Sequence, residues 1–406
     1  MSYTQLYRLL KSKIDYLQDE IILDDKTKVY NLEFISSGNV LPGNETCYCK
    51  EHDITFKAED NFRTDIGEGA RLIDVRDSHI IENKRFIIQI FTPVDVVSSK
   101  KAILLFHGFN EKSWEKYYPW AKRLSEITGK AVILFPMAFH MNRAPHLWSS
   151  KYEMFELSKI RKGMFPDVRY STLLNVAISS RLHIRPQRFI WSGLQSYNDV
   201  IAFVESVKEN KIPFLEPDTR FDIFAYSIGV LLSQILMMTN TKGYFDNTKL
   251  CMFCGGAVFN RLSSASKFII DSKANVALYS YLIEHFESHI KQNMRLKHYM
   301  EDHLEGIHLS TMLNYGKNRP YRESLFRKMS DRIMAITLKN DQIIPYYEII
   351  NTLKGVARDI PIPVEVKDYP YPYTHENPFL VGSKYEDEVT RSFEETIGDV
   401  AHFLNT

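Results

Sequence analysis

Two nearly continuous apolar runs flank a helical pattern, and this arrangement constrains the fold more than any other feature. Residues 102–106 read AILLF and residues 131–137 read AVILFPM, so neither run alternates polar with apolar side chains. The helix between them should begin near Pro119 and end at Gly129. Strands that are apolar on both faces are typical of parallel sheets covered by helices and joined by right-handed crossovers. We therefore expect an α/β fold around a mostly parallel sheet.

Other runs extend this alternation of strands and helices. Residues 71–77 and 84–93 read as an antiparallel pair that leads into the first of the two apolar strands. A helix is expected from Ser196, because Asp199 stands three residues later, as in a capped helix start. Further candidate strands lie just before Ser227 and near 249–256, 331–338 and 363–370.

Two stretches, 140–195 and 257–330, do not fit the alternation. Both leave the carboxyl ends of predicted parallel strands, which is the edge where such sheets bind ligands. A chain of 406 residues with 44% hydrophobic content can bury a large core, so a single large domain with insertions is expected. The two stretches are therefore predicted to form a helical cap.

Charge and cysteine content argue against several classes of protein. Lys and Arg number 51 against 50 Asp and Glu, and a net charge of +1 offers no broad basic field for nucleic acid. Residues 1–20 form an amphipathic, charged helix pattern rather than a signal peptide, and no stretch reaches the roughly 18 apolar residues of a membrane span. Four cysteines in so long a chain do not make a disulfide framework. We expect a cytoplasmic protein without a membrane span or a nucleic-acid partner.

The segment 221–239, FDIFAYSIGVLLSQILMMT, changes character at Ser227. A short β-prone run precedes the serine, and apolar residues at the spacing of a buried helix follow it. Ala225 and Gly229 are small where the strand and the helix must approach each other closely. A serine on such a sharp strand-to-helix turn has a strained backbone and an exposed hydroxyl. In the structural alternative, Ser227 only caps the helix.

Four short motifs follow one another along the chain: HGF at 107–109, AYSIG at 225–229, NDQIIP at 340–345 and THENPF at 374–379. In this order they resemble the motifs of the α/β-hydrolase superfamily, whose triad runs nucleophile, acid, histidine along the chain. The resemblance covers roughly residues 75–406 and is to a bacterial branch of the superfamily. It implies an α/β-hydrolase domain over 71–406 with the two cap insertions, after an N-terminal extension at 1–70. The sequence departs from the usual pattern at Ala225, where glycine is more common.

The resemblance assigns a role to each of five residues. Ser227 would be the nucleophile, and it needs a base because a serine hydroxyl is almost un-ionised at neutral pH. His375 would take and return the proton, since a histidine pKa lies near the working pH. Asp341 would hold the imidazole in the correct tautomer. The backbone N–H groups of Phe109 and Ile228 would form the oxyanion hole.

Each triad residue also has a structural alternative. Asp341 could be a turn-former after a strand, with Asp331 or Glu348 as the acid instead. His375 lies in a Pro-rich segment and could be an exposed loop histidine. His107, in the first motif, is expected to be a structural hydrogen-bonding residue rather than a base.

The loop HMNRAP at 140–145 leaves the end of the strand at 131–137 and should lie at the rim of the site. Arg143 and Asn142 are therefore predicted to bind substrate, and the guanidinium could hold a carboxylate or phosphate through a bidentate pair. In the alternative, Arg143 pairs with an acid of the insertion, Glu153 or Glu156, and fixes that segment in place.

Metal binding is considered and not predicted. The segment 249–256 reads as a buried strand, on which residues three apart point to opposite faces. The stretch HLEGIH at 303–308 lacks the spacing of a zinc-binding H-E-x-x-H helix, so a solvated helix end or loop is expected. The thiols that could together hold zinc are Cys47 and Cys49, followed by His52, and Cys251 and Cys254.

Together these patterns predict a cofactor-independent serine hydrolase that acts on a small-molecule ester or thioester through an acyl-enzyme. Acyl transfer by the same triad is an open alternative, because the choice of acceptor depends on pocket shape. A non-catalytic binding protein of the same fold is another, because a fold alone does not fix function. The patterns do not indicate an oligomeric state.

Overall fold

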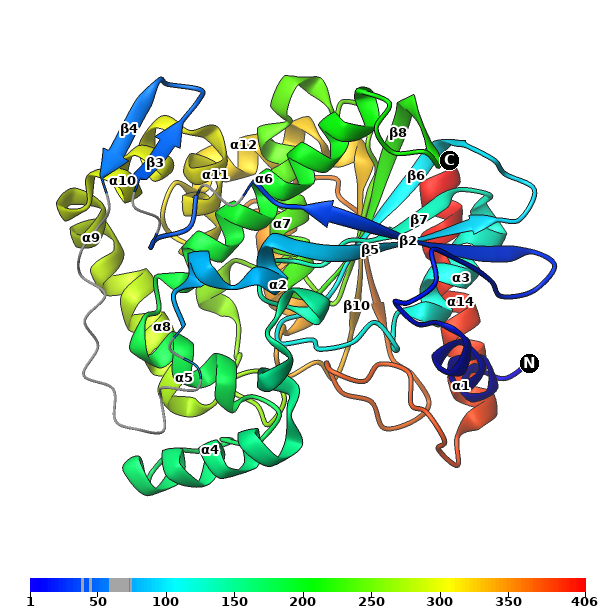
Figure 1. Cartoon of the computed structure of the whole chain (residues 1–406), viewed down its shortest axis with the longest axis horizontal. Helices are drawn as coiled ribbons and strands as arrows, with labels where there is room; N and C mark the ends of the chain where they lie inside the picture. Colours follow the sequence, from blue (N-terminus) through cyan, green and yellow to red (C-terminus); the bar gives the residue numbers. More distant parts are fainter. Residues whose placement is uncertain (38–39, 44–45, 58–72, 74) are drawn as a thin grey trace.

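The apolar runs of the sequence form the centre of a nine-stranded sheet (Figure 1). The structure is a computed structural model and describes residues 1–37, 40–43, 46–57, 73 and 75–406. In sheet order the strands are β1 (Glu20–Ile22), β2 (Thr27–Ile35), β5 (Arg85–Pro93), β7 (Ala131–Leu134), β6 (Ser99–Phe106), β8 (Leu215–Tyr226), β9 (Leu250–Phe253), β10 (Ile333–Leu338) and β11 (Val364–Lys367).

The sheet is mostly parallel, as predicted. The strands from β7 to β11 in sheet order are parallel to one another, and β1, β2 and β5 form an antiparallel edge. The apolar run of β6 is explained by its position between two cores, because Leu104 packs into one of them and Ile103 into the other. This sheet, with helices on both faces and a sharp turn after β8, is the predicted α/β-hydrolase fold.

The prediction that residues 71–77 pair with β5 is wrong. β5 pairs with β2 over its whole length, and Val29 lies opposite Phe91. The sheet thus takes β1 and β2 from the part of the chain predicted to be an extension. Of the predicted partner strand, 71–77, residues 71, 72 and 74 lie outside the described residues. The division of the chain at residue 70 stays a prediction.

Helices cover both faces of the sheet. On one face lie α1 (Tyr3–Lys13), α3 (Tyr118–Thr128) and α14 (Glu386–Asn405). On the other lie α6 (Arg188–Lys208), α7 (Ile228–Thr239) and α13 (Tyr346–Leu353). The predicted limits of α3 are confirmed, because Pro119 is in its first turn and Gly129 ends it with a φ of +69°. No helix in the described part of the chain is both long and apolar enough to cross a bilayer.

The two stretches predicted as a cap are largely helical and contact each other through α5 and α8. The first contains α4 (Lys151–Met164) and α5 (Val176–Ile184). The second contains α8 (Ser272–Ser280), a π-helical turn (Tyr281–His285), α9 (Phe286–Gln292), α10 (Met294–Lys297), a second π-helical turn (His298–Asp302), α11 (Leu304–Leu313) and α12 (Arg319–Lys328). A hairpin of β3 (Thr46–Cys49) and β4 (Ile54–Lys57) lies beside this second stretch in Figure 1.

The helix predicted to begin at Ser196 begins earlier, at Arg188, and contains Ser196 as an interior residue of α6. The Ser196 hydroxyl donates to the Ser192 carbonyl within the helix, 2.7 Å away, so it caps nothing. Buried apolar residues such as Trp191 continue the helical pattern upstream of the predicted start. The short remaining helices are α2 (Ile81–Lys84) and the 3₁₀ turns Asp77–His79, Met141–Arg143, His146–Ser149, Thr241–Gly243, Phe259–Arg261 and Ser330–Arg332.

Candidate active site

Ser227 stands on a strained turn between β8 and α7. Its backbone has a φ of 56° and a ψ of −122°, a region that residues with a Cβ rarely occupy. Gly229 allows the turn to close, because a Cβ there would lie 2.8 Å from the His107 carbonyl oxygen. The Ser227 side chain makes no capping hydrogen bond to the helix. The capping alternative therefore does not describe this serine.

The three residues predicted as a triad lie in hydrogen-bond contact. Ser227 Oγ is 2.7 Å from His375 Nε2, and His375 Nδ1 is 2.7 Å from Asp341 Oδ2. The other carboxylate oxygen of Asp341 accepts the N–H groups of Ile343 and Ile344, each at 2.9 Å. These two bonds fix the carboxylate after β10, so that its second oxygen faces the imidazole.

The alternatives for the acid and the histidine do not match this geometry. His375 is buried, with 3% of its surface exposed, so it is not a solvent-facing loop histidine. Asp331 is exposed at the opposite end of β10. The carboxylate of Glu348 accepts from Asn351 within α13. Of the three carboxylates considered, only that of Asp341 contacts the imidazole.

Tyr226 supports the histidine, a role that the sequence reasoning missed. Its hydroxyl donates a hydrogen bond to the His375 carbonyl oxygen, and its ring stacks on the imidazole with centroids 5.5 Å apart. Burial raises the pKa of Tyr226 well above its usual value, so the hydroxyl keeps its proton. Lys116 Nζ lies 3.2 Å from the carbonyl oxygen of Glu376, the next residue along. The loop that carries His375 is thus fixed by contacts from two other elements.

The predicted oxyanion-hole residues lie beside Ser227. In the part of the chain that the structure describes, neither the Phe109 nor the Ile228 N–H has an acceptor. The preceding N–H, that of Gly108, donates to the Tyr117 hydroxyl at 2.8 Å. The bond between Gly108 and Tyr117 fixes the turn that carries the Phe109 N–H.

His107 has the structural role expected for it. Its Nε2 accepts the Met137 N–H at 3.0 Å, so its Nδ1 carries the proton and donates to the Gly108 carbonyl at 2.8 Å. Burial, with a smaller effect from the neighbouring His140, lowers the pKa of His107 well below its usual value. Both ring nitrogens are occupied, and the ring stays neutral.

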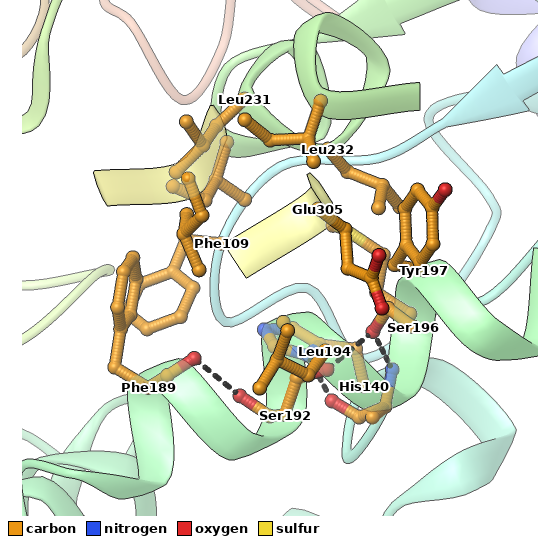
Figure 2. Close-up of a pocket in the computed structure, with 16 residues that line it drawn as sticks. Phe109, His140, Phe189, Ser192, Leu194, Ser196, Tyr197, Leu231, Leu232 and Glu305 are labelled. Carbon is orange, nitrogen blue, oxygen red and sulfur yellow. Dashed lines mark hydrogen bonds between the residues drawn. The ribbon is translucent and has the colours of Figure 1, made fainter. Parts of the chain in front are cut away.

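Apolar cavities adjoin the serine. One of about 370 Å³, counting the space open to solvent, is lined by Ser227, Ile228 and Phe109 and by aliphatic and aromatic residues of the second insertion. A second of about 630 Å³ shares Phe109 and Ile228 with the first and is shown in Figure 2. Glu305 of α11 projects into it, opposite leucines of α7. The second insertion therefore forms part of the wall of both cavities.

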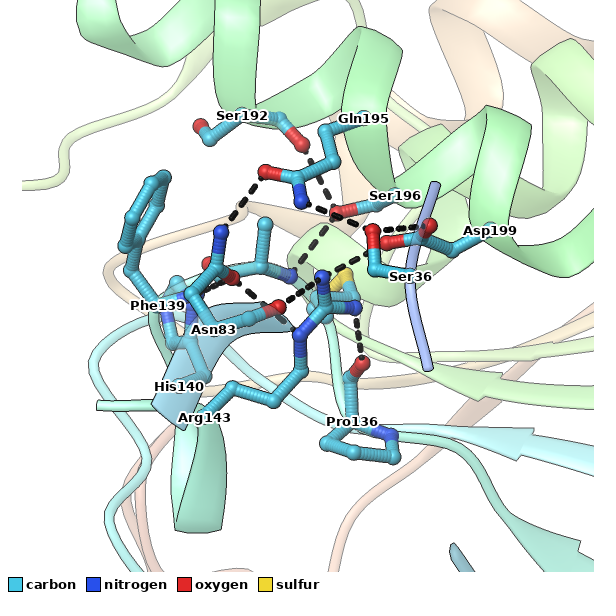
Figure 3. A network of polar contacts seen from close by, with 12 residues as sticks. Ser36, Asn83, Pro136, Phe139, His140, Arg143, Ser192, Gln195, Ser196 and Asp199 are labelled. Atoms are coloured by element: carbon cyan, nitrogen blue, oxygen red, sulfur yellow. Dashed lines mark hydrogen bonds and ion pairs between the residues drawn. The ribbon is translucent and has the colours of Figure 1, made fainter. Parts of the chain in front are cut away.

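The structure does not bring Arg143 to these cavities, and this corrects its predicted role. The side chain is fully buried, with its guanidinium 2.6 Å from a carboxylate oxygen of Asp199 (Figure 3). Three further hydrogen bonds bind it to the Pro136 carbonyl and to Asn83. The acid is thus on α6 and is neither of the two predicted glutamates. All of these contacts are internal, and none leaves the guanidinium open to a ligand.

Two more features of the same region belong to the fold. Asn142 donates to the Ile87 carbonyl at 2.9 Å and lines neither cavity beside Ser227. Asp199 also accepts the Ser36 hydroxyl at 2.6 Å, and burial raises the pKa of this carboxyl even though Arg143 lowers it. The loop 140–145 is therefore fixed to the sheet and α6, and it does not recognise substrate through these two side chains.

The four thiols do not form one cluster in the described residues. Cys251 lies in β9 of the main sheet, and Cys49 lies at the end of β3 in the separate hairpin. The stretch 303–308, expected to be a solvated helix end or loop, is mostly buried instead. It forms the start of α11, and His303 is only 5% exposed.

Comparison with known proteins finds solved structures of similar fold and one family that matches the sequence. No curated protein matches the sequence. The esterase Est22 in complex with p-nitrophenol is 11% identical, with a TM-score of 0.45, over 99% of this chain and 86% of the other. Carboxyl esterase 2 of the fungus Tuber melanosporum is 11% identical with a TM-score of 0.41 over 79% and 81%, and an esterase of Pseudomonas putida is 10% identical with a TM-score of 0.42 over 80% of each chain. A family model described as "Family of unknown function (DUF6051)" matches residues 1–405, and the chain therefore belongs to this family.

Proposed function

We propose that the protein is a serine hydrolase that cleaves a carboxylic ester or thioester through an acyl-enzyme on Ser227. The observation that carries the proposal is the contact of Ser227 Oγ with His375 Nε2 at 2.7 Å, on a strained turn next to two N–H groups without acceptors. A serine that only supported the fold would not need this combination.

The hydrogen bonds determine how the proton would move. Asp341 accepts two backbone N–H groups and the His375 Nδ1–H, so it holds the imidazole in one tautomer. The Nε2 lone pair then faces the Ser227 hydroxyl and takes its proton as Oγ attacks the carbonyl carbon. Backbone N–H groups of Phe109 and Ile228 would stabilise the oxyanion.

The second half of the reaction uses the same groups. His375 returns the proton to the leaving alcohol or thiol, and the acyl group stays on Ser227. Water then enters, gives a proton to Nε2 and attacks the acyl carbon. The bond from that carbon to Ser227 Oγ breaks as Nε2 returns the proton to Oγ, and the carboxylic acid is released. Each step requires only the proton transfer between Nε2 and an oxygen or sulfur atom.

The cavity walls favour an uncharged, apolar acyl or alcohol group. The smaller cavity is lined by Phe259, Ile270 and Ile344 among other apolar residues, and neither it nor the larger one has a Lys or Arg side chain in its wall. Burying an aliphatic chain against such walls is favourable by roughly 25 cal/mol per Å². With Arg143 occupied internally, these two cavities offer no cationic partner for an anionic substrate.

A fluorophosphonate probe tests the proposal, because only a base-activated serine beside an oxyanion hole reacts quickly. We expect labelling of Ser227 alone, none in Ser227→Ala, and turnover of p-nitrophenyl esters that depends on acyl-chain length. A folded, unlabelled wild-type protein would contradict the proposal and favour a binding protein of the same fold. Addition of alcohol acceptors to the ester assay would reveal acyl transfer as a new ester product.

A further inference from the structure

Four side chains of the types that bind metals in proteins lie close together, and none of them belongs to the triad. They are Cys49 at the end of β3, His52 in the β3–β4 turn, and His298 and His303 at the two ends of the sequence HYMEDH, just before α11. Their four potential ligand atoms lie within 4.8 Å of one another. Three of the side chains are buried, and His52 closes the cluster on the solvent side.

Three of the distances between these atoms are close to those around a tetrahedral zinc ion. With Zn–S of about 2.3 Å and Zn–N of about 2.0–2.1 Å, tetrahedral geometry separates S from N by about 3.6 Å and N from N by about 3.3 Å. Cys49 Sγ is 3.6 Å from His52 Nδ1 and 3.3 Å from His303 Nε2. His303 Nε2 is 3.2 Å from His298 Nε2. An ion at the centre would need the remaining pairs, which lie within 4.8 Å of each other, to come closer together.

Carboxylates lie on the outer side of the two buried histidines. His298 Nδ1 is 2.8 Å from an Asp302 oxygen, and His303 Nδ1 is 3.3 Å from an oxygen of each of Glu51 and Glu305. The Asp302 bond holds the proton of His298 on Nδ1, so the His298 Nε2 lone pair faces the interior of the cluster. The Glu51 and Glu305 oxygens lie near His303 Nδ1 without an oriented hydrogen bond to it. Lone pairs of two nitrogens 3.2 Å apart repel each other unless a cation or a proton lies between them. Histidines that bind metals have this carboxylate arrangement.

The backbone around the histidines is shaped to bring them together. His298–Asp302 is a π-helical turn, which hydrogen-bonds residues five apart, and His303 is five residues after His298. Gly306 then allows α11 to start directly against this turn, because a Cβ there would lie 2.7 Å from the Met300 Cα. The wide turn and the glycine at close approach are uncommon local features that lie beside the histidine pair.

We propose that Cys49, His52, His298 and His303 bind one zinc ion. A thiolate with imidazole nitrogens suits zinc among the common divalent metals, and four protein ligands leave no open position, as in structural sites. Binding converts the Cys49 thiol to a thiolate and releases its proton to solvent. The ion would fix the β3–β4 hairpin to the start of α11, whose Glu305 and Leu309 line the larger cavity. The proposal does not depend on the function proposed for Ser227.

The full chain, stripped with a chelator under reducing conditions, is titrated with zinc against a chromophoric competitor, and its metal content is measured by mass spectrometry. We expect one zinc per chain and a higher melting temperature on binding. Cobalt in place of zinc should give the thiolate charge-transfer band and the intense d–d bands of tetrahedral coordination. Folded wild-type protein that binds neither metal would overturn the proposal and leave a shared proton between the histidines.

Matched variants locate the site. Cys49→Ser and His298→Ala should lose the cobalt bands and the zinc-dependent melting shift, and Asp302→Asn should weaken zinc by about 10- to 100-fold. The control is Cys47→Ser, two residues away on β3, whose Sγ contacts the Tyr299 hydroxyl at 3.5 Å and is outside the cluster. It should bind zinc like the wild type. Equal loss in Cys47→Ser and Cys49→Ser, or unchanged binding in both Cys49→Ser and His298→Ala, would overturn the assignment.

Discussion

The triad region and the Cys–His cluster share the same pairing of a histidine with a carboxylate, but different groups lie opposite the Nε2 atom. In both, a carboxylate behind the ring holds a proton on Nδ1, so that Nε2 presents a lone pair. At His375 that lone pair faces a hydroxyl, which can give up a proton. At His298 it faces another imidazole nitrogen and a nearby thiol, which together can hold a cation. The comparison shows that the group opposite Nε2, rather than the histidine and its carboxylate, indicates the chemistry.

The largest effect is expected from removal of the base. His375→Ala should lower kcat by roughly three to six orders of magnitude toward p-nitrophenyl esters, because Ser227 loses its proton acceptor. The melting temperature should change little, and zinc binding should not change at all. His402→Ala, in an exposed position on α14, is the control and should behave as wild type. A variant that kept its activity and lost stability would make His375 a structural residue and break the comparison.

A paired substitution of the two carboxylates sharpens the comparison. Asp341→Asn should cost about 10⁴-fold in kcat, because an amide favours the wrong tautomer when a proton must move through Nε2. Asp302→Asn should reduce zinc affinity by only about 10- to 100-fold, because a metal can itself orient the ring. Kinetics and zinc titration on both variants measure the two ratios. Wild-type rates in Asp341→Asn would transfer the acid role to another carboxylate.

Arg143 is the contrasting case, a buried charge whose bonds all point inward. Arg143→Ala should destabilise the fold by about 3–5 kcal/mol, because it leaves the Asp199 carboxylate buried without its partner. Chemical denaturation measures this loss. In the fraction that remains folded, KM for anionic and neutral esters should be unchanged. A selective rise in KM for anionic esters by one or two orders of magnitude would contradict this and restore Arg143 as a substrate residue.

The smallest effect is expected from Tyr226→Phe. It removes the donor to the His375 carbonyl and should reduce kcat about tenfold, equivalent to roughly 1.4 kcal/mol, through looser placement of the imidazole. Tyr371→Phe is a matched control, because Tyr371 also donates to a backbone carbonyl, that of Pro378, without touching the histidine. Equal kinetic losses in both variants would assign the effect to general loosening of the loop.

The contact among the three proposed triad residues was predictable because each of them follows a strand, in a fixed order along the chain. Ser227, Asp341 and His375 follow β8, β10 and β11, and carboxyl ends of parallel strands meet at one edge of the sheet. Tyr226 was not predictable, because its bond to the His375 carbonyl joins residues 149 positions apart and depends on how a loop packs. The partner of Arg143, Asp199, was not predicted for the same reason, because an ion pair leaves no periodic pattern in the sequence.

Two other features that the sequence reasoning did not predict have a recognisable pattern in the sequence. Residues 30–34, YNLEF, alternate apolar with polar side chains, which is typical of a strand with one covered face. The pairs Cys49-x-x-His52 and His298-x₄-His303 each have a spacing found in zinc sites, but 254 residues separate Cys49 from His303. Spacing alone predicts the halves of such a cluster, and only the packing of the hairpin on the second insertion joins them.

The pairing of β2 with β5 has a practical consequence for anyone who trims the chain. A fragment that starts near residue 71 would lose β2 and with it the strand that covers the edge of β5 over nine residue pairs. The uncovered edge would present a row of unpaired N–H and C=O groups beside the buried Ile88 and Ile90. Such an edge is a template for pairing with another chain. Shortened versions of this protein are therefore expected to collect in inclusion bodies, however intact their catalytic turn.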